Sequence, residues 1–192
     1  LTSSKDVIVI TISIIGKVPS GKFVSRRGAR NGDFLFVTGI LGASKLGLNN
    51  FDKKSKNYDF VKKRYLLPEP RINFGLKVRD YANSMIDISD GLIQDAGHLA
   101  RLSNLELDLD FRNIPLTKIK HVSYKKILNA ALYGGDDYEL LFSSSPNNEK
   151  KLFQTANDLG LNLSKIGKFR KGAAGKIFYN SKEIKNESYM HF

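Results

Sequence analysis

Residues 85–92 read Met-Ile-Asp-Ile-Ser-Asp-Gly-Leu, a short alternating segment that leads directly into a run suited to a helix. Successive side chains of a strand point to opposite faces, so Ile86 and Ile88 share one face while Asp87 and Ser89 share the other. We therefore expect a strand whose apolar face packs in the core and whose polar face carries oxygen atoms to the strand end.

Strands and helices alternate on both sides of this segment. The alternation lacks the strict regularity of a doubly wound parallel sheet, which favours an α+β domain with α/β/α layers and a mixed sheet. The sequence predicts strands at 34–38, 85–89, 105–111, 137–143, 163–169 and 175–179, and helices near 58–66, 71–81, 91–102, 123–133 and 147–159.

The N-terminal segment 7–15 has a period-two pattern of its own, with isoleucine at alternate positions, and this pattern predicts a strand. A strand needs neighbouring strands to pair with, so we expect residues 1–15 to be a remnant strand of a further, N-terminal domain. The turn signal at 19–21, Pro-Ser-Gly, marks residues 16–25 as a linker. Residues 26–192 then follow as one domain.

The composition is that of a folded protein. Of the 192 residues, 41% are hydrophobic and 10% aromatic, which is enough for one domain with a substantial core. Because the chain has no cysteine, a disulfide or thiolate metal site is excluded, any metal must be held by oxygen or imidazole, and a reducing cytoplasm suits the protein. The longest apolar run, residues 7–15, is too short to span a bilayer, so we expect no membrane partner.

The formal net charge of +12 raises the question of a nucleic-acid partner. Clustered Lys and Arg neutralise nucleic-acid phosphates, but here the basic residues are scattered and their clusters are short, such as 53–54 and 62–64. We interpret the charge as that of a generally basic surface. A basic nucleic-acid-binding module stays an alternative.

Asp87, Ser89 and Asp90 form the sharpest candidate site. Two carboxylates and a hydroxyl within four residues at a strand end suit a hard cation such as Mg²⁺, which takes oxygen ligands and often bridges to phosphates. The start of the following helix adds backbone amides and a partial positive charge that favour an anion. Asp90 or Ser89 could instead cap the helix, although capping accounts for only one of the three polar residues.

Two further groups carry potential chemistry. Asp95 and His98 lie three residues apart on one helix face, and because two ligands are too few for a metal site, we expect a structural pair that orients the histidine or supports the neighbouring site. Residues 134–142 run from a glycine turn past three carboxylates into a strand, and one carboxylate could accept a hydrogen bond from a substrate amino group. A helix C-cap followed by an edge strand explains the same residues equally well.

Both ends of the domain carry weaker candidates. Arg26 and Arg27 beside Gly28 could hold a phosphate through forked hydrogen bonds, or could form a solvated basic turn. Residues 189–192, Tyr-Met-His-Phe, are unusually apolar and aromatic for a chain end. We therefore expect this tail to dock on the protein. A Walker-type phosphate loop, a dinucleotide fingerprint and a paired-histidine zinc motif are all absent from the sequence.

An ordered set of segments identifies a family resemblance. The segments are Gly-Lys-Val-Pro-Ser-Gly-Lys (16–22), Arg-Arg-Gly-Ala-Arg-Asn-Gly-Asp (26–33), Val-Thr-Gly (37–39), Arg-Tyr-Leu-Leu-Pro-Glu-Pro-Arg (64–71), Ile-Asp-Ile-Ser-Asp-Gly-Leu (86–92) and Gly-Gly-Asp-Asp-Tyr-Glu-Leu-Leu-Phe (134–142). In order and spacing they resemble thiamine-monophosphate kinases, whose wider superfamily includes aminoimidazole ribonucleotide synthetase and selenophosphate synthetase.

The resemblance implies an enzyme that phosphorylates thiamine monophosphate to thiamine diphosphate, with ATP as co-substrate and Mg²⁺ as cofactor, at a cleft between two domains. Asp87 and Asp90 match metal ligands of the family. Ser89 and Arg26 match its ATP contacts.

The residues that resemble substrate contacts each depart from the family pattern. Asp136 stands where a substrate-binding glutamate is usual, and its side chain is shorter by one methylene. Tyr189 matches an aromatic residue that contacts thiamine, but it lies in a Ser-Tyr-Met-His-Phe tail where the family tends to have Gly-aromatic-Asp-His-Phe.

The resemblance also implies a missing part. In the family, an N-terminal ATP-binding domain carries most of the acidic magnesium ligands, so we expect residues 1–15 to be its last strand, the present chain to be the C-terminal domain, and this chain to be inactive alone. A homodimer through the N-terminal domain is expected as well. A selenophosphate synthetase-like enzyme with the same fold is the alternative enzymatic interpretation.

Overall fold

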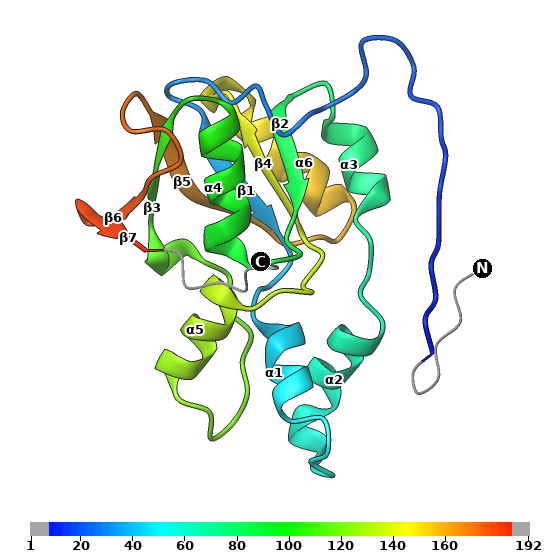
Figure 1. Ribbon diagram of the computed structural model, residues 1–192. Helices are drawn as coiled ribbons and strands as arrows, with labels where there is room; N and C mark the ends of the chain where they lie inside the picture. The colour runs from blue at the N-terminus through cyan, green and yellow to red at the C-terminus, as the bar shows by residue number, and fades with distance from the viewer. Residues whose placement is uncertain (1–7, 186–192) are drawn as a thin grey trace.

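The structure, a computed structural model, describes residues 8–185 (Figure 1). Its strands are β1 (Phe34–Thr38), β2 (Ala82–Asp87), β3 (Glu106–Leu109), β4 (Leu140–Ser144), β5 (Leu163–Arg170), β6 (Ile177–Tyr179) and β7 (Lys182–Ile184). Its α-helices are α1 (Ala43–Asn49), α2 (Asp59–Leu66), α3 (Ile72–Val78), α4 (Leu92–Leu102), α5 (Tyr124–Tyr133) and α6 (Glu149–Asp158). The strands form one mixed sheet in the order β2-β4-β1-β5-β3-β6-β7, antiparallel except for the parallel pair β3 and β6.

The alternation of side chains on the central strands gives the sheet two apolar faces. On β1, Leu35 and Val37 join one core cluster, while Phe36 between them joins another. On the neighbouring β4, Leu141 and Phe142 divide in the same way. A strand buried on both faces needs a cover on each side, which explains the layered architecture.

Different helices cover the two faces of the sheet (Figure 1). Helix α4 packs in the cluster that contains Leu35, and α3 and α6 pack in the cluster that contains Phe36. Helices α1, α2 and α5 form a third cluster beside one end of the sheet (Figure 1). The expected α+β class, with α/β/α layers and a mixed sheet, is confirmed.

The strand and helix at 85–92 meet as the sequence predicted. Ile86 and Ile88 are 6% and 0% exposed and pack in one cluster with Leu92, Ala96 and Leu99 of α4. Burial of these apolar side chains is worth roughly 1.5–3 kcal/mol for each large one. Asp87, the polar residue between the two isoleucines, therefore lies on the opposite side of the strand end.

Several boundaries differ from those the sequence predicted. Strand β1 occupies the predicted residues, whereas the strand expected at 137–143 begins only at Leu140. Asp136 and Tyr138 have φ angles of 65° and 50°, in the left-handed region, and this backbone cannot continue a strand ladder. Strand β7, which pairs with β6, was not predicted.

The prediction of a strand at 7–15 is wrong for its described part. Residues 8–15 form no strand, and the isoleucines at 8, 10, 12 and 14 are 92%, 79%, 78% and 89% exposed. In Figure 1 this dark blue segment runs apart from the sheet, so its backbone has no neighbouring strand to bond with. Its assignment to a further domain stays a prediction.

Within residues 8–185, no helix has the length and apolar character that crossing a membrane requires.

Replacing Phe142 by alanine tests the core between the sheet and α3. Phe142 is fully buried and its ring centroid lies 5.4 Å from that of Phe36 and 5.9 Å from that of Phe74. We expect Phe142→Ala to lower the free energy of unfolding by about 3–5 kcal/mol, because the cavity adds to the lost burial. Urea denaturation measures the loss, and Phe23→Ala, at a side chain 74% exposed, is the control. Equal denaturation midpoints for the two variants would contradict this packing.

Candidate functional site

The two sequence motifs that carry carboxylates lie side by side. Strand β2 ends at Asp87, and the turn that follows pairs with residues 136–139 through three backbone hydrogen bonds. Ile88 N donates to Glu139 O at 2.9 Å, Tyr138 N donates to Ile88 O at 2.9 Å, and Asp136 N donates to Ser89 O at 3.0 Å. The chain thus joins the strand end at Asp87 to the glycine turn before β4.

Gly135 is required at this junction because the two backbones approach closely. A Cβ atom at Gly135 would lie 2.1 Å from Ser89 O, a distance that no real Cβ contact has. The obstacle is a backbone atom, which cannot rotate away as a side chain can. A glycine at this position therefore allows the motifs to meet.

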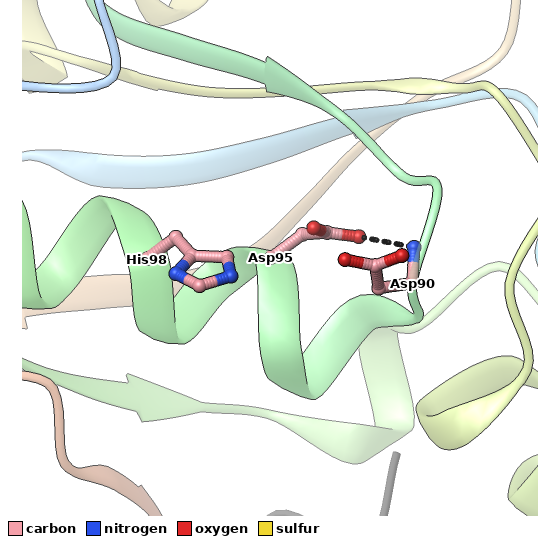
Figure 2. A group of neighbouring side chains, drawn as sticks. All are labelled: Asp90, Asp95 and His98. Carbon is pink, nitrogen blue, oxygen red and sulfur yellow. Dashed lines mark hydrogen bonds between the residues drawn. The ribbon is translucent and has the colours of Figure 1, made fainter. Parts of the chain in front are cut away.

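Asp95 holds the turn between β2 and α4 (Figure 2). Its Oδ2 atom accepts hydrogen bonds from the backbone N–H groups of Ser89, Asp90 and Gly91 at 3.1, 3.1 and 3.2 Å. The residue is 1% exposed. Burial raises the pKa of Asp95 to about 6, against the lowering effect of the N–H donors. Of the two roles expected for Asp95, support of the neighbouring turn is the one its hydrogen bonds show.

His98, on α4, lies beside Asp95 of the same helix and Asp90 of the preceding turn (Figure 2). The ligand atoms of these three residues lie within 4.8 Å of one another. The Nδ1 atom of His98 is 3.1 Å from Nη2 of Arg101, so the ring is held by Arg101. Burial lowers the pKa of His98, and the positive charges of Arg101 and Arg26 lower it further. Asp95 directs Oδ2 to three N–H groups, so Oδ1 is the oxygen that it could offer to a metal.

A cleft of about 810 Å³ opens beside this group, between α4 and the β6–β7 hairpin. Its polar lining includes Asp90, His98, Arg101, Lys176 and Glu183. Arg26 is exposed and close enough for its charge to lower the pKa of His98. Both signs of charge therefore meet here, which suits a metal together with an anionic ligand.

Asp136 faces the strand end from the other motif. Its Oδ1 atom accepts a hydrogen bond from the Tyr138 hydroxyl at 3.1 Å. Burial raises the pKa of Tyr138, and the negative charges of Asp136, Asp87 and Asp90 raise it further. The charges of three of the candidate carboxylates therefore act on one phenol hydroxyl.

Asp137 and Glu139, on the opposite side of the same segment, were not singled out from the sequence. Asp137 accepts hydrogen bonds from the N–H groups of Gly42 and Ser44 at 2.6 and 3.1 Å. Glu139 binds a threonine and two arginines, listed with their distances to its carboxylate: Thr38 Oγ1 at 2.7 Å, Arg64 Nη2 at 2.7 Å, Arg71 Nε at 2.8 Å and Arg71 Nη2 at 2.7 Å. The signal in the sequence was the pair of arginines that bounds segment 64–71.

The remaining predicted residues are placed as follows. Ser89 is half-buried, and its backbone is used by Asp95 and Asp136. Arg27 is exposed, and its backbone N–H donates to Ser25 Oγ at 3.1 Å in a local turn. Tyr189 lies outside the described residues.

The burial of Asp137 predicts a pH dependence of stability. Burial raises the pKa of Asp137 from 3.8 to about 6, although the N–H groups of Gly42 and Ser44 lower it. Between these values the folded protein binds more protons than the unfolded chain, so the free energy of unfolding falls as the pH rises from about 4 to about 6.

In Asp137→Asn this contribution is removed. The decrease in the free energy of unfolding between pH 4 and pH 6 should therefore be smaller in the variant by up to about 3 kcal/mol. This is the equivalent of a two-unit pKa difference. Urea denaturation of both proteins at pH 4, 5 and 6 measures it. Parallel pH profiles would show that Asp137 does not titrate in this range.

Comparisons with known proteins show which proteins this chain is similar to. No protein-family model matches the chain. The thiamine-monophosphate kinase of Buchnera aphidicola subsp. Schizaphis graminum is 37% identical over 193 residues, which cover 95% of this chain and 60% of the relative. The crystal structure of thiamine-monophosphate kinase from Stenotrophomonas maltophilia gives a TM-score of 0.79 at 30% identity, covering 87% of this chain and 56% of that one.

A complex of AaThiL with AMPPCP and TMP gives a TM-score of 0.76 at 32% identity, covering 88% of this chain and 54% of that one. The present chain spans about 60% of the length of the curated relatives it matches. Similarity in sequence and in fold extends over nearly all of the chain. It is therefore a homologue of the thiamine-monophosphate kinase family, related to the C-terminal part of its members.

Proposed function

We propose that this chain supplies part of the active site of an ATP-dependent kinase that converts thiamine monophosphate to thiamine diphosphate. The observation that carries the proposal is the meeting of the Asp87–Asp90 turn with the Asp136 segment at one end of the sheet. The AaThiL complex with AMPPCP and TMP supports a nucleotide and a monophosphate as the two ligands.

The donor set at the end of β2 fits Mg²⁺. Asp87 and Asp90 offer carboxylate oxygens, and both are half-buried, so they are accessible to an ion and partly shielded from water. Asp90 Oδ2 also accepts a hydrogen bond from Gln94 Nε2 at 3.0 Å, which limits the rotation of this carboxylate. When bound, Mg²⁺ would neutralise charge on the transferred phosphoryl group.

The other proposed contacts surround this turn. The exposed guanidinium of Arg26 would bind ATP phosphate, and the Ser89 hydroxyl would donate to the nucleotide. Asp136 would accept a hydrogen bond from the substrate amino group. Tyr189, outside the described residues, is proposed as a further substrate contact.

Phosphoryl transfer depends on positioning and on neutralising charge, so a site with few acidic ligands should be incomplete. We therefore propose that catalysis also needs the portion of the relatives that this chain does not match. In this proposal residues 1–15 belong to an ATP-binding domain, residues 16–25 are the linker, the domain forms a homodimer, and the enzyme acts in the cytoplasm.

A chimera tests the proposed activity. The 192-residue chain alone should form no thiamine diphosphate from ATP and thiamine monophosphate. A chimera in which the chain replaces the matching 60% of the Buchnera relative should form it. In the chimera, Asp87→Asn and Asp90→Asn should each lower kcat by about 10²–10³, the usual loss for a group that stabilises transition-state charge.

The control is Asp108→Asn, a carboxylate on β3 that forms a surface ion pair with Arg170. Turnover by the isolated chain would overturn the proposed incompleteness. Wild-type turnover in both the Asp87 and Asp90 variants would overturn the proposed site.

Asp95 should act on the metal through the turn it holds. In the chimera, Asp95→Asn removes the charge that binds the N–H groups of Ser89, Asp90 and Gly91, so the Mg²⁺ concentration for half-maximal activity should rise about 10–100-fold, as for other residues that orient metal ligands. Titration of activity with Mg²⁺ at saturating ATP measures this change. An unchanged Mg²⁺ requirement would show that Asp95 contributes to folding alone.

A further inference from the structure

Tyr138 occupies the outward side of the segment that leads into β4. Side chains alternate along 136–139, with Asp137 and Glu139 1% and 0% exposed and Asp136 and Tyr138 outside, Tyr138 being 39% exposed. The two inward carboxylates are bonded to backbone N–H groups and to arginines on the far side. These anchors fix which way the outward side chains face.

Two hydrogen bonds hold Tyr138, one through its backbone and one through its hydroxyl. The backbone N–H of Tyr138 donates to Ile88 O at 2.9 Å, and the hydroxyl donates to Asp136 Oδ1 at 3.1 Å. The backbone of Tyr138 is thus tied to the strand end, and its hydroxyl is tied to the proposed substrate-binding carboxylate. A large aromatic surface is held in place at low entropic cost while it remains partly exposed.

The surroundings of the ring are negative. The charges of Asp136, Asp87 and Asp90 all act on the Tyr138 hydroxyl. The face of an aromatic ring is itself the negative side of a quadrupole and attracts cations. Mg²⁺ prefers oxygen ligands to a ring face, so the ring suits a polarisable organic cation beside the carboxylates.

We propose that Tyr138 is a specificity-determining residue, which places its ring against the thiazolium cation of thiamine monophosphate. This inference rests on the proposed function, because that function supplies the substrate. Contact with the ring favours the charged heterocycle over an uncharged one of the same shape.

The experiment compares two ligands that differ in charge. Binding of thiamine monophosphate, and of its analogue with the charged thiazolium nitrogen replaced by carbon, is measured by calorimetry on the 192-residue chain with Mg²⁺ and AMPPCP present. The variants are Tyr138→Leu and Tyr138→Trp. Tyr124→Leu, at a tyrosine 63% exposed at the start of α5, is the matched control.

Tyr138→Leu should weaken binding of thiamine monophosphate roughly tenfold and leave binding of the uncharged analogue within about twofold, because it removes a cation–π contact. Tyr138→Trp should keep or increase the preference for the charged ligand, which a misfolded protein could not do. The control should match the wild type. A variant that weakens both ligands equally, or neither, would overturn the role of Tyr138.

Failure of this inference is distinguishable from failure of the proposed function. If the wild-type chain binds neither ligand, the Tyr138 contact is overturned for this chain, and kinase activity of the chimera still decides the function. If the chimera has no kinase activity but the charge preference depends on Tyr138, the cation contact stands without the reaction.

Discussion

The buried carboxylate of Glu139 is the constraint on which the arrangement of the site depends. It is fully buried and binds Arg64, Arg71 and Thr38, which come from α2, the segment before α3, and β1. A buried charge without partners would cost several kcal/mol, so the three elements are held together at this point. Because Glu139 immediately precedes β4, its position also fixes the register at which residues 136–138 reach the end of β2.

Asp95 holds the turn between β2 and α4 in the same way that Glu139 holds the segment before β4. The carboxylate of Glu139 accepts hydrogen bonds from side-chain donors, whereas that of Asp95 accepts them from three backbone N–H groups of the 89–91 turn. In both cases the buried acid has satisfied hydrogen bonds, whereas the neighbouring acids Asp87, Asp90 and Asp136 are half-buried. The division between buried and half-buried carboxylates is therefore set by the direction of each side chain, and the local density of acidic residues does not reveal it.

The sequence predicted this arrangement in part. The strand–helix unit at 85–92 was predictable because Ile86 and Ile88 obey the period-two rule and their burial dominates the local energetics. The start of β4 was not, because left-handed φ angles at Asp136 and Tyr138 interrupt a segment whose composition favours a strand. The long-range bonds of Glu139 were also hidden, since the hydrogen bond to Arg71 spans 68 positions and no local pattern encodes it.

The backbone at Asp136 and Tyr138 is strained, and the buried residues beside these two positions hold it. A left-handed conformation costs a non-glycine residue roughly 1–2 kcal/mol, and such residues persist where the surroundings over-determine them. Here the surroundings are Asp137 and Glu139, whose buried bonds alternate with the two strained positions. If residues 137 and 139 were free to move, the chain could relax into a longer strand, and Asp136 and Tyr138 would lose the backbone conformation that places both side chains on the outer side. The buried hydrogen bonds and ion pairs of Asp137 and Glu139 thus offset the backbone strain at Asp136 and Tyr138. Stabilisation on the inner side of the segment maintains the geometry on its outer side.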